Sequence, residues 1–152
     1  MPLTGTFTRS VDDKQRVTLP KELRAALGEH CEGIFEGIFY VAPGTDGSLA
    51  IYDEPAFVRL GQRLADAPPA QRDVRAFGRL FYAQAHRVEI DKQGRLRIPG
   101  TLSDWAGLSR EAVLVGVGDH MELWDTVRWE TYTTDKKDKY DELAEAAFGY
   151  PK

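Results

Sequence analysis

Two short polar segments carry the charged side chains of this sequence whose types and spacing could do chemistry. The segment DDKQRVTLP, residues 12–20, recurs as DKQGRLRIP at residues 91–99. Each segment combines an aspartate, an arginine four residues later and further basic groups. An aspartate in such a position can accept the N–H groups of a tight turn, while arginine and lysine bind phosphate oxygens and the edges of bases. The residue types therefore indicate recognition of an anionic polymer.

The basic residues of this region form the candidate nucleic-acid site. They are Lys14, Arg16, Arg87, Lys92, Arg95 and Arg97. Asp12, Asp91 and Gly94 are expected to shape the two turns, and each aspartate is expected to pair with the arginine four residues on. A purely structural role in these Asp–Arg pairs is the alternative for Arg16 and Arg95. It does not account for the other arginines on the polar face, which two copies of the turn could combine into one basic patch.

The sequence offers little for catalysis. His30, His86 and His120 are scattered, and none has a metal-ligand spacing with Cys31, the one cysteine. GVGDHM, residues 116–121, resembles a glycine-rich phosphate loop only faintly, because it is expected to join two strands and opens no helix. No nucleophile or metal site accompanies the aspartates and arginines of the turns. We therefore expect no enzymatic activity, no cofactor and no metal.

The elements that must position the polar segments occur twice along the chain. Residues 11–23 align without gaps with residues 90–102, and residues 49–57 align with residues 121–129. The offset falls from 79 to 72 residues between these blocks, so seven residues have been added to the first copy between Gly28 and Ser48. A unit of roughly 50 residues seldom buries enough surface alone, so the two copies should share one core.

Alternating apolar and polar residues predict strands around each polar segment. Val17 and Leu19 alternate with polar residues in the first copy, and the second copy repeats the pattern. DDKQ and DKQG then form the tight connections of two β-hairpins, in which Gly94 is free to take a positive φ. Gln15 stands at the equivalent position of the first copy, so that turn is either of another type or strained.

Helices are expected after these strands. The dipeptides Leu-Pro and Ile-Pro lead into PKELRAALG, residues 20–28, which should stop at Gly28, and into the shorter PGTLSDWAG, residues 99–107. Further strands are expected at residues 37–42, 48–53, 112–118 and 120–125. Asp53 and Asp125 follow two of these strands as helix N-caps. The helix after Asp53 should place Phe57, Leu60 and Leu64 on one face.

Two more helices are expected outside the repeats. Residues 70–83 should form a helix that buries Val74, Phe77, Leu80 and Phe81. Another face of that helix carries Arg72, Arg75 and Arg79, for which a solvated surface is favoured over a ligand-binding stripe. Residues 134–149 should form a charged tail helix with Tyr140, Leu143, Ala147 and Phe148 along one side.

Composition limits the classes of function. The formal net charge of −4 counts against a simple polyanion binder, yet residues 9–24 and residues 87–97 each carry two more basic than acidic side chains. The first residues lack the basic and apolar regions of a signal peptide, and no apolar run approaches the roughly 20 residues of a membrane helix. The single Cys31 is expected to be a buried thiol in a reducing cytosol.

Taken together, these motifs resemble the MraZ family of bacterial transcriptional regulators. The resemblance rests on the two D-x-x-x-R turns followed by Leu-Pro or Ile-Pro, the opening GTF, the middle segment DVRAFGRLFYAQAH, and VGVGDHMELWD. It covers nearly the whole chain. The sequence departs from the family at Gln15, where a glycine usually follows the lysine, and in the longer segment GEHCEGIFEGIFY, residues 28–40.

The resemblance implies an α+β fold of two SpoVT–AbrB-type units, β-rich and of the swapped-hairpin type, with pseudo-twofold symmetry and flanking short helices. Unit one would span residues 5–54 and unit two residues 84–127, with connecting helices at 55–83 and a helical tail at 128–152. The family's aspartates fall on Asp12 and Asp91 and its arginines on Arg16 and Arg95.

The resemblance also implies a function and partners. It implies a ring-shaped homo-oligomer, cytoplasmic and nucleoid-associated, that binds double-stranded DNA at short direct repeats upstream of its own cell-division and cell-wall operon. Neither a membrane nor a small-molecule substrate is expected. The alternative is an AbrB-like antitoxin or an oligomeric scaffold whose C-terminal helix binds a protein partner. Such antitoxins usually have one unit and a long acidic tail, whereas this chain has two units and a short tail of mixed charge.

Overall fold

The computed structural model describes residues 2–30 and 37–149, so the expectation for Cys31 lies outside the described residues. Antiparallel strands alternate with helices, which confirms the predicted α+β class. The first copy contains β1 (Thr6–Ser10), β2 (Arg16–Thr18), α1 (Lys21–His30), β3 (Ile38–Pro43), β4 (Leu49–Asp53) and α2 (Glu54–Asp66). Next come α3 (Arg72–Gln84), β5 (His86–Glu89), β6 (Arg95–Arg97), α4 (Gly100–Ala106), β7 (Glu111–Gly116) and β8 (Met121–Asp125). They are followed by α5 (Thr126–Lys136), the 3-10 helix η1 (Lys137–Lys139) and α6 (Tyr140–Phe148).

The strand before each polar turn separates from the strand after it. β1 pairs with β7 of the second copy and β5 pairs with β3 of the first, in a six-stranded sheet of order β1-β7-β8-β4-β3-β5. β2 and β6 form a separate two-stranded ladder. Each turn still closes locally, as expected, and in the first copy Val11 bridges to Val17, but the two arms then join different sheets. This arrangement agrees with the swapped-hairpin type of fold that the resemblance implies. This exchange lets each copy complete the sheet of the other, which supplies the shared core that so short a unit lacks alone.

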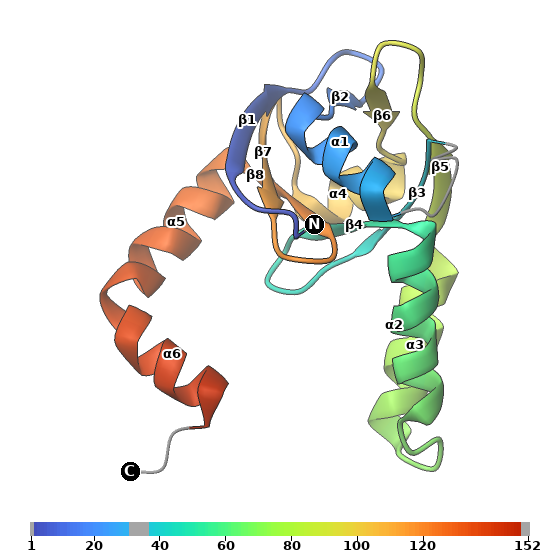
Figure 1. Ribbon diagram of the computed structural model, residues 1–152, viewed down its shortest axis with the longest axis vertical. Coiled ribbons are helices and arrows are strands. Elements are labelled where there is room, and N and C mark those ends of the chain that lie inside the picture. Colours follow the sequence, from blue (N-terminus) through green and yellow to red (C-terminus); the bar gives the residue numbers. More distant parts are fainter. Residues whose placement is uncertain (1, 31–36, 150–152) are drawn as a thin grey trace.

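The strand pairing is symmetric about an axis that relates the two copies. Exchanging β1 with β5, β3 with β7 and β4 with β8 turns the sheet order into its own reverse. In the small ladder, Val17 pairs with its own equivalent, Leu96, so the axis passes through this pair. Figure 1 shows the consequence for the shape of the molecule. The turns that follow β1 and β5 lie at one end, and two helical arms, α2–α3 and α5–α6, extend from the other end.

The main core lies between the ladder and one face of the large sheet. It includes residues next to both turns and residues of the sheet, among them Val17, Leu19, Phe39, Ile51, Leu96, Ile98, Leu114 and Leu123. α4 covers this face against β3, β4 and β8. Because the apolar residues of the ladder point into this core, their polar neighbours must point outward.

The other face of the sheet carries one smaller apolar cluster under each arm. Under α2 and α3, Tyr52 and Phe81 are buried with Phe57 packed against them. Under α5, Trp124 packs against Trp129 and Tyr132. Asp53 and Asp125 cap α2 and α5 as predicted, since their carboxylates accept hydrogen bonds from Ala56 N–H at 2.8 Å and Val127 N–H at 3.2 Å.

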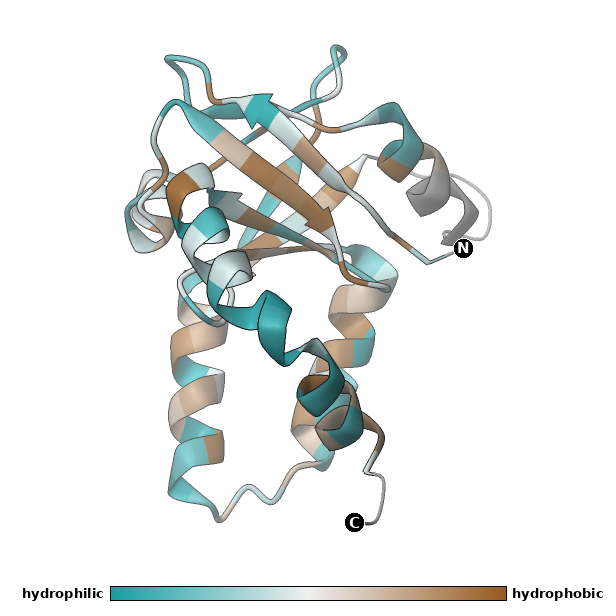
Figure 2. Cartoon of the chain, turned by 90° about the vertical axis from the view of Figure 1, so that its left-hand side faces the viewer, coloured by the Kyte–Doolittle hydropathy of each residue, from teal (hydrophilic) through white to brown (hydrophobic). Residues whose placement is uncertain are grey.

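The arms expose more apolar surface than the sequence predicts. Phe77 and Leu80 of α3 were expected in the core, but they are 48% and 63% exposed, because α2 and α3 extend beyond the sheet and only their base meets it. Tyr140 and Leu143 of α6 are also exposed. Figure 2 shows apolar stretches along both arms, whereas the middle of the α5–α6 arm is strongly hydrophilic. Among the described residues, no helix has the length and apolar character needed to cross a membrane.

The helix between the first turn and β3 also differs in length from the expectation. α1 continues to His30, two residues beyond the predicted stop at Gly28. α4 ends before Gly107, as predicted, with that glycine in the left-handed region. The strand limits agree with the sequence pattern to within two residues.

Candidate nucleic-acid interface

The outward face of the β2–β6 ladder gathers charged residues from both copies. Val17 and Leu96 are 1% and 0% exposed, so the residues on either side of them point away from the core. Arg16 pairs with Arg97 in the ladder, and Arg95 pairs with Thr18 of β2. The structure thus brings three of the predicted arginines onto one surface, at the end of the molecule opposite the arms (Figure 1).

The first turn is closed by hydrogen bonds to Asp12. Gln15 N–H donates to the Asp12 carbonyl at 3.0 Å, and Asp12 N–H donates to the Arg16 carbonyl at 3.1 Å. The Asp12 carboxylate accepts from the N–H groups of Lys14 and Arg16, both at 2.9 Å, and from Arg16 Nε at 2.7 Å. A single carboxylate therefore fixes both the backbone of the turn and the direction of its arginine.

The second turn repeats this arrangement with Asp91. Its carboxylate accepts from the N–H groups of Gln93 and Arg95, both at 2.9 Å, and from Arg95 Nε at 2.8 Å. Arg95 Nη1 also lies 3.9 Å from the Asp12 carboxylate, so the two turns interact across the symmetry axis.

These contacts favour the charged form of both carboxyl groups. The N–H of Arg16 is the main cause that lowers the pKa of Asp12, and the N–H of Arg95 does the same for the pKa of Asp91. Arg16 and Arg95 each use Nε for this contact, and their side chains remain 27% exposed. A guanidinium oriented in this way loses less conformational entropy when its terminal nitrogens bind a base or a phosphate.

A residue with positive φ ends each turn. Gln15 has a φ of 61° and Gly94 a φ of 79°, so the two turns share one shape and the first is the strained one. This conformation costs a residue other than glycine about 1–2 kcal/mol.

Each turn is also hydrogen-bonded to the other copy. The Gln15 carbonyl accepts from Ile98 N–H at 2.8 Å, and the Gly94 carbonyl accepts from Leu19 N–H at 2.9 Å.

Two side chains that sequence analysis missed support these turns. Ser103 Oγ of α4 donates to Gln15 Oε1 at 2.9 Å. Arg24 of α1 occupies the equivalent place in the other copy and covers Gly94, where an added Cβ would lie 2.8 Å from Arg24 Cζ. The alignment of the two copies contains a signal for this. Gln15 aligns with Gly94, and Arg24 aligns with Ser103. In each contact the larger residue faces the smaller one: Gln15 contacts Ser103, and Arg24 contacts Gly94.

Arg87 lies beside the ladder rather than on its outward face. It belongs to β5 and, together with Arg97, lines a hollow of about 520 Å³ that also includes Gln15, His86 and Glu89. His86 is exposed, with Nδ1 2.8 Å from the Gln84 carbonyl, and sequence analysis did not identify it as a site residue. The basic groups of this hollow can bind an anionic oxygen, although Glu89 opposes them.

Lys14 and Lys92 lie at the tips of the two turns, and both are exposed. Asp13 stands beside Lys14, whereas Gln93 stands beside Lys92, so only the second tip carries a net positive charge. The candidate interface therefore consists of the outward ladder face, the two tips and the hollow that Arg87 lines.

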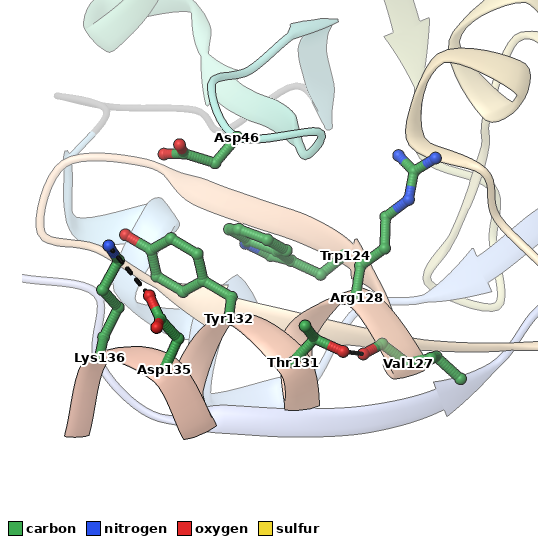
Figure 3. Close-up of a pocket in the computed structure, with 8 residues that line it drawn as sticks. All are labelled: Asp46, Trp124, Val127, Arg128, Thr131, Tyr132, Asp135 and Lys136. Atoms are coloured by element: carbon green, nitrogen blue, oxygen red, sulfur yellow. Dashed lines mark hydrogen bonds and ion pairs between the residues drawn. The ribbon is translucent and has the colours of Figure 1, made fainter. Parts of the chain in front are cut away.

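Another hollow lies away from the turns, under α5 (Figure 3). It has a volume of about 550 Å³, with Trp124 and Tyr132 on its wall and Asp46 of the β3–β4 loop across from them. Arg128 Nη1 donates to the carbonyls of Gly47 at 3.2 Å and Trp105 at 3.3 Å, so this arginine connects the β3–β4 loop to the last turn of α4. Within the part of the chain that the structure describes, no group of three or more His, Cys, Asp or Glu side chains is placed to hold a metal.

Comparisons with known proteins agree on one family. A family model described as "MraZ protein, putative antitoxin-like" matches the chain twice, at residues 3–80 and 81–150. A "Transcriptional regulator MraZ" of Limosilactobacillus reuteri is 41% identical over 143 residues, which cover 94% of this chain and 95% of that protein. Proteins of the same name from Alkaliphilus oremlandii and Salinispora arenicola are 39% and 36% identical, and the alignments cover at least 92% of each chain.

Proposed function

This chain belongs to the MraZ family of transcriptional regulators, and we propose that it regulates by binding short direct repeats of double-stranded DNA upstream of its own cell-division and cell-wall operon. A regulator of this family is not an enzyme. The observation that carries the proposal is the β2–β6 ladder, which presents Arg16, Arg95 and Arg97 on one outward surface.

The ladder has a form that suits the major groove. A two-stranded β-ribbon fits that groove, where the terminal nitrogens of an arginine can donate to O6 and N7 of guanine. Arg16 and Arg95 are held at Nε by Asp12 and Asp91, and both side chains are 27% exposed, so their terminal nitrogens can make such contacts. We assign base reading to these arginines and to Arg97.

The remaining basic residues suit contacts with phosphate. Lys14 and Lys92 lie at the turn tips, and Arg87 lies in the neighbouring hollow. Phosphate contacts position a protein on the duplex, whereas base contacts carry the sequence information. Asp12, Asp91 and Gly94 would then shape the turns that present both groups.

Assembly would allow a chain with a net charge of −4 to bind DNA. We propose a ring-shaped homo-oligomer in which the turns of many copies lie on one face and contact successive DNA repeats. The exposed apolar residues of the arms, such as Phe77, Leu80 and Tyr140, support contacts between copies. Residues 5–54 and 84–127 would form the two DNA-binding units, with residues 55–83 and 128–152 as connecting and tail segments. DNA as a partner would make the protein cytoplasmic and nucleoid-associated.

A titration against labelled DNA tests the proposal. The DNA upstream of the protein's own gene should bind far more tightly than a shuffled sequence of the same composition. Affinity should also fall steeply as salt rises, since bound cations are released from every phosphate that a basic residue neutralises. Equal affinity for both sequences, or binding unchanged by salt, would contradict the proposed recognition.

A protein-interaction function is the second candidate, favoured by the exposed tail helix α6 and by the antitoxin-like description of the family model. An AbrB-like antitoxin or a scaffold would use the tail to hold a protein partner. The same titration discriminates the two, because a pure scaffold has no preference for the upstream DNA.

A further inference from the structure

The outward face of the β2–β6 ladder departs from the symmetry of the two copies at one position. The axis that relates the copies exchanges Arg16 with the identical residue Arg95. It also exchanges Thr18 with Arg97, which differ in size, charge and hydrogen-bonding groups. Both of these side chains are exposed, so neither is required by the core. The backbone of the ladder is therefore symmetric, whereas the side chains on its outward face are not.

The two ends of the ladder consequently present different groups. At the end next to the first turn, Arg16 lies directly opposite Arg97, and we call this the double-arginine end. At the end next to the second turn, Arg95 lies directly opposite Thr18, and we call this the threonine end. The backbone of the two ends is built alike, since the last carbonyl of each turn accepts a hydrogen bond from the other copy.

The hollow that Arg87 lines lies beside the double-arginine end. Arg97 lines the same hollow, so two arginines of the second copy lie on this side. The offset that aligns the copies places Thr8 of β1 in the position of Arg87 of β5. Arg9, the basic residue next to Thr8, donates from Nη1 to the Thr8 carbonyl at 2.8 Å, within its own strand. Both differences between the copies therefore have the same direction, with arginine near one end of the ladder and threonine near the other.

The double-arginine end carries a repulsion that a ligand can offset. Like charges directly opposite each other in an antiparallel ladder lower its stability. Asp12 neutralises part of this charge by accepting from Arg16 Nε at 2.7 Å. Acceptors on bases would reduce the repulsion further, because each guanidinium could then donate to its own acceptor. The pair of arginines therefore suits an electronegative surface.

Arginine and threonine also suit different bases. Arginine donates to O6 and N7 of guanine, whereas threonine makes an apolar contact with the methyl group of thymine or a single hydrogen bond. A base sequence that matches the double-arginine end therefore does not match the threonine end. Reversing the DNA on the ladder exchanges the two halves of the site and leaves both ends poorly matched.

We propose that Arg97 and Thr18 determine the direction in which the protein binds each DNA repeat. The inference rests on the proposed function and identifies the residues that select direct over inverted repeats. Rotation about the axis of the proposed ring relates each copy to the next, so the direction from the threonine end to the double-arginine end has the same sense in every copy. DNA that follows the ring then meets successive copies in one direction. Repeats that all run one way match this arrangement, whereas an inverted repeat does not.

Titration against DNA with one reversed repeat tests the proposal. The first duplex is the upstream region with its direct repeats, the second has one repeat replaced by its reverse complement, and the third has that repeat shuffled. We define the reversal penalty as the Kd for the second duplex divided by the Kd for the first. For the parent the penalty should be roughly tenfold, the discrimination expected when one good arginine–guanine contact is lost.

Exchange of the two residues provides the decisive measurement. Thr18→Arg and Arg97→Thr each make the outward face of the ladder symmetric, so each single variant should bind the first two duplexes with nearly equal affinity. The double variant Thr18→Arg, Arg97→Thr interchanges the two ends and keeps the composition and net charge of the parent. It should regain the reversal penalty that both single variants lose. A general effect of charge on affinity would not be restored in this way. Thermal melting checks that the exposed substitutions leave each variant folded.

The other outcomes are distinguishable. If both single variants keep the parent's reversal penalty, direction is determined elsewhere, for example by the unopposed Lys92 of the second tip, and the proposal is wrong. A double variant without the penalty also overturns it. A parent that binds the reversed repeat like the direct one, yet prefers both to the shuffled duplex, overturns the inference and leaves sequence-specific binding in place. A parent that binds all of the duplexes equally contradicts the proposed function itself.

Discussion

The turn of residues 12–15 and the turn of residues 91–94 follow the same backbone path with different residues at its most demanding position. Gln15 takes a left-handed conformation in the first turn and Gly94 takes it in the second. The neighbouring helix differs to match, because Ser103 leaves room for the Gln15 side chain and Arg24 fills the space above Gly94. A turn and the helix that supports it therefore differ together between the two copies.

This difference shows which features of the duplicated turn the fold requires. The aspartate, its hydrogen bonds to two N–H groups and its contact with an arginine Nε are the same in both copies. The residue with positive φ can be glutamine or glycine, provided that the neighbouring side chain of the supporting helix differs in size to match. The tips also differ, since Asp13 and Lys14 balance in the first copy while Lys92 is unopposed in the second. We therefore expect the two turns to be equal in shape and unequal in charge.

The largest effect is expected when the second turn is given the residue of the first. Gly94→Gln should lower the free energy of unfolding by about 2–4 kcal/mol, because it adds left-handed strain and pushes against the Arg24 guanidinium. Adding Arg24→Ser should recover about half of this loss by recreating the Gln15–Ser103 arrangement. Urea unfolding followed by circular dichroism, at a fixed protomer concentration, measures both.

Gly100→Gln is the matched control for that experiment, since an added Cβ there meets no atom within 4 Å. It should unfold close to the parent. If Arg24→Ser does not increase the stability of the Gly94→Gln variant, the size of residue 24 is not what determines whether residue 94 can be a glutamine.

Removal of the turn arginines should weaken DNA binding. Arg16→Ala and Arg95→Ala should each reduce the free energy of specific binding by about 1–3 kcal/mol. Titration against the upstream repeats measures the loss, and calorimetric melting should show only a small shift because both side chains are partly exposed. A melting temperature lowered by many degrees would assign these arginines a structural role. Parent-like DNA binding by folded variants would remove them from the interface.

Two substitutions at Gln15 separate its strain from its hydrogen bond. Gln15→Ala keeps the strained φ and loses the bond from Ser103, which should cost about 1 kcal/mol of stability. Gln15→Gly also loses the bond but relieves about 1 kcal/mol of strain, so it should unfold close to the parent. Urea unfolding of both variants tests this order. Equal stability of the glycine and alanine variants would mean that the first turn stores no strain.

The smallest effect is expected from acid. The pKa values of Asp12 and Asp91 are lowered in the fold, so their contribution to stability is complete above the unfolded value of about 3.9 and is lost as pH falls through the lowered values. Thermal melting between pH 7 and pH 2 should show this decline only below about pH 4. The double variant Asp12→Asn, Asp91→Asn keeps an oxygen acceptor at each position but cannot be protonated there, so its melting temperature should fall less steeply below about pH 4. An unchanged acid limb in this variant would show that other carboxylates cause the decline.

Several features of the fold follow from the sequence because they depend on local chemistry. The repeat of residues 11–23 at 90–102 predicts two equivalent units, and alternation around Val17 predicts the outward direction of Arg16. The two aspartate caps also follow from position alone, since a carboxylate after a strand reaches the free N–H groups of the next helix turn. The grouping of Arg16, Arg95 and Arg97 could be predicted for a different reason, since the aligned copies imply a symmetry that brings their polar faces together.

Tertiary structure decided the features that depend on partners distant in the sequence. The exchange of β1 and β5 between the copies, the support of Gly94 by Arg24, and the position of Arg87 beside the ladder depend on contacts between distant parts of the chain. Burial is decided at the same level: α3 has the apolar pattern of a core helix, yet Phe77 and Leu80 lie exposed because the helix extends past the sheet that it was expected to cover. Periodicity in a sequence identifies the apolar side of a helix, whereas only the tertiary structure determines whether the same chain covers that side.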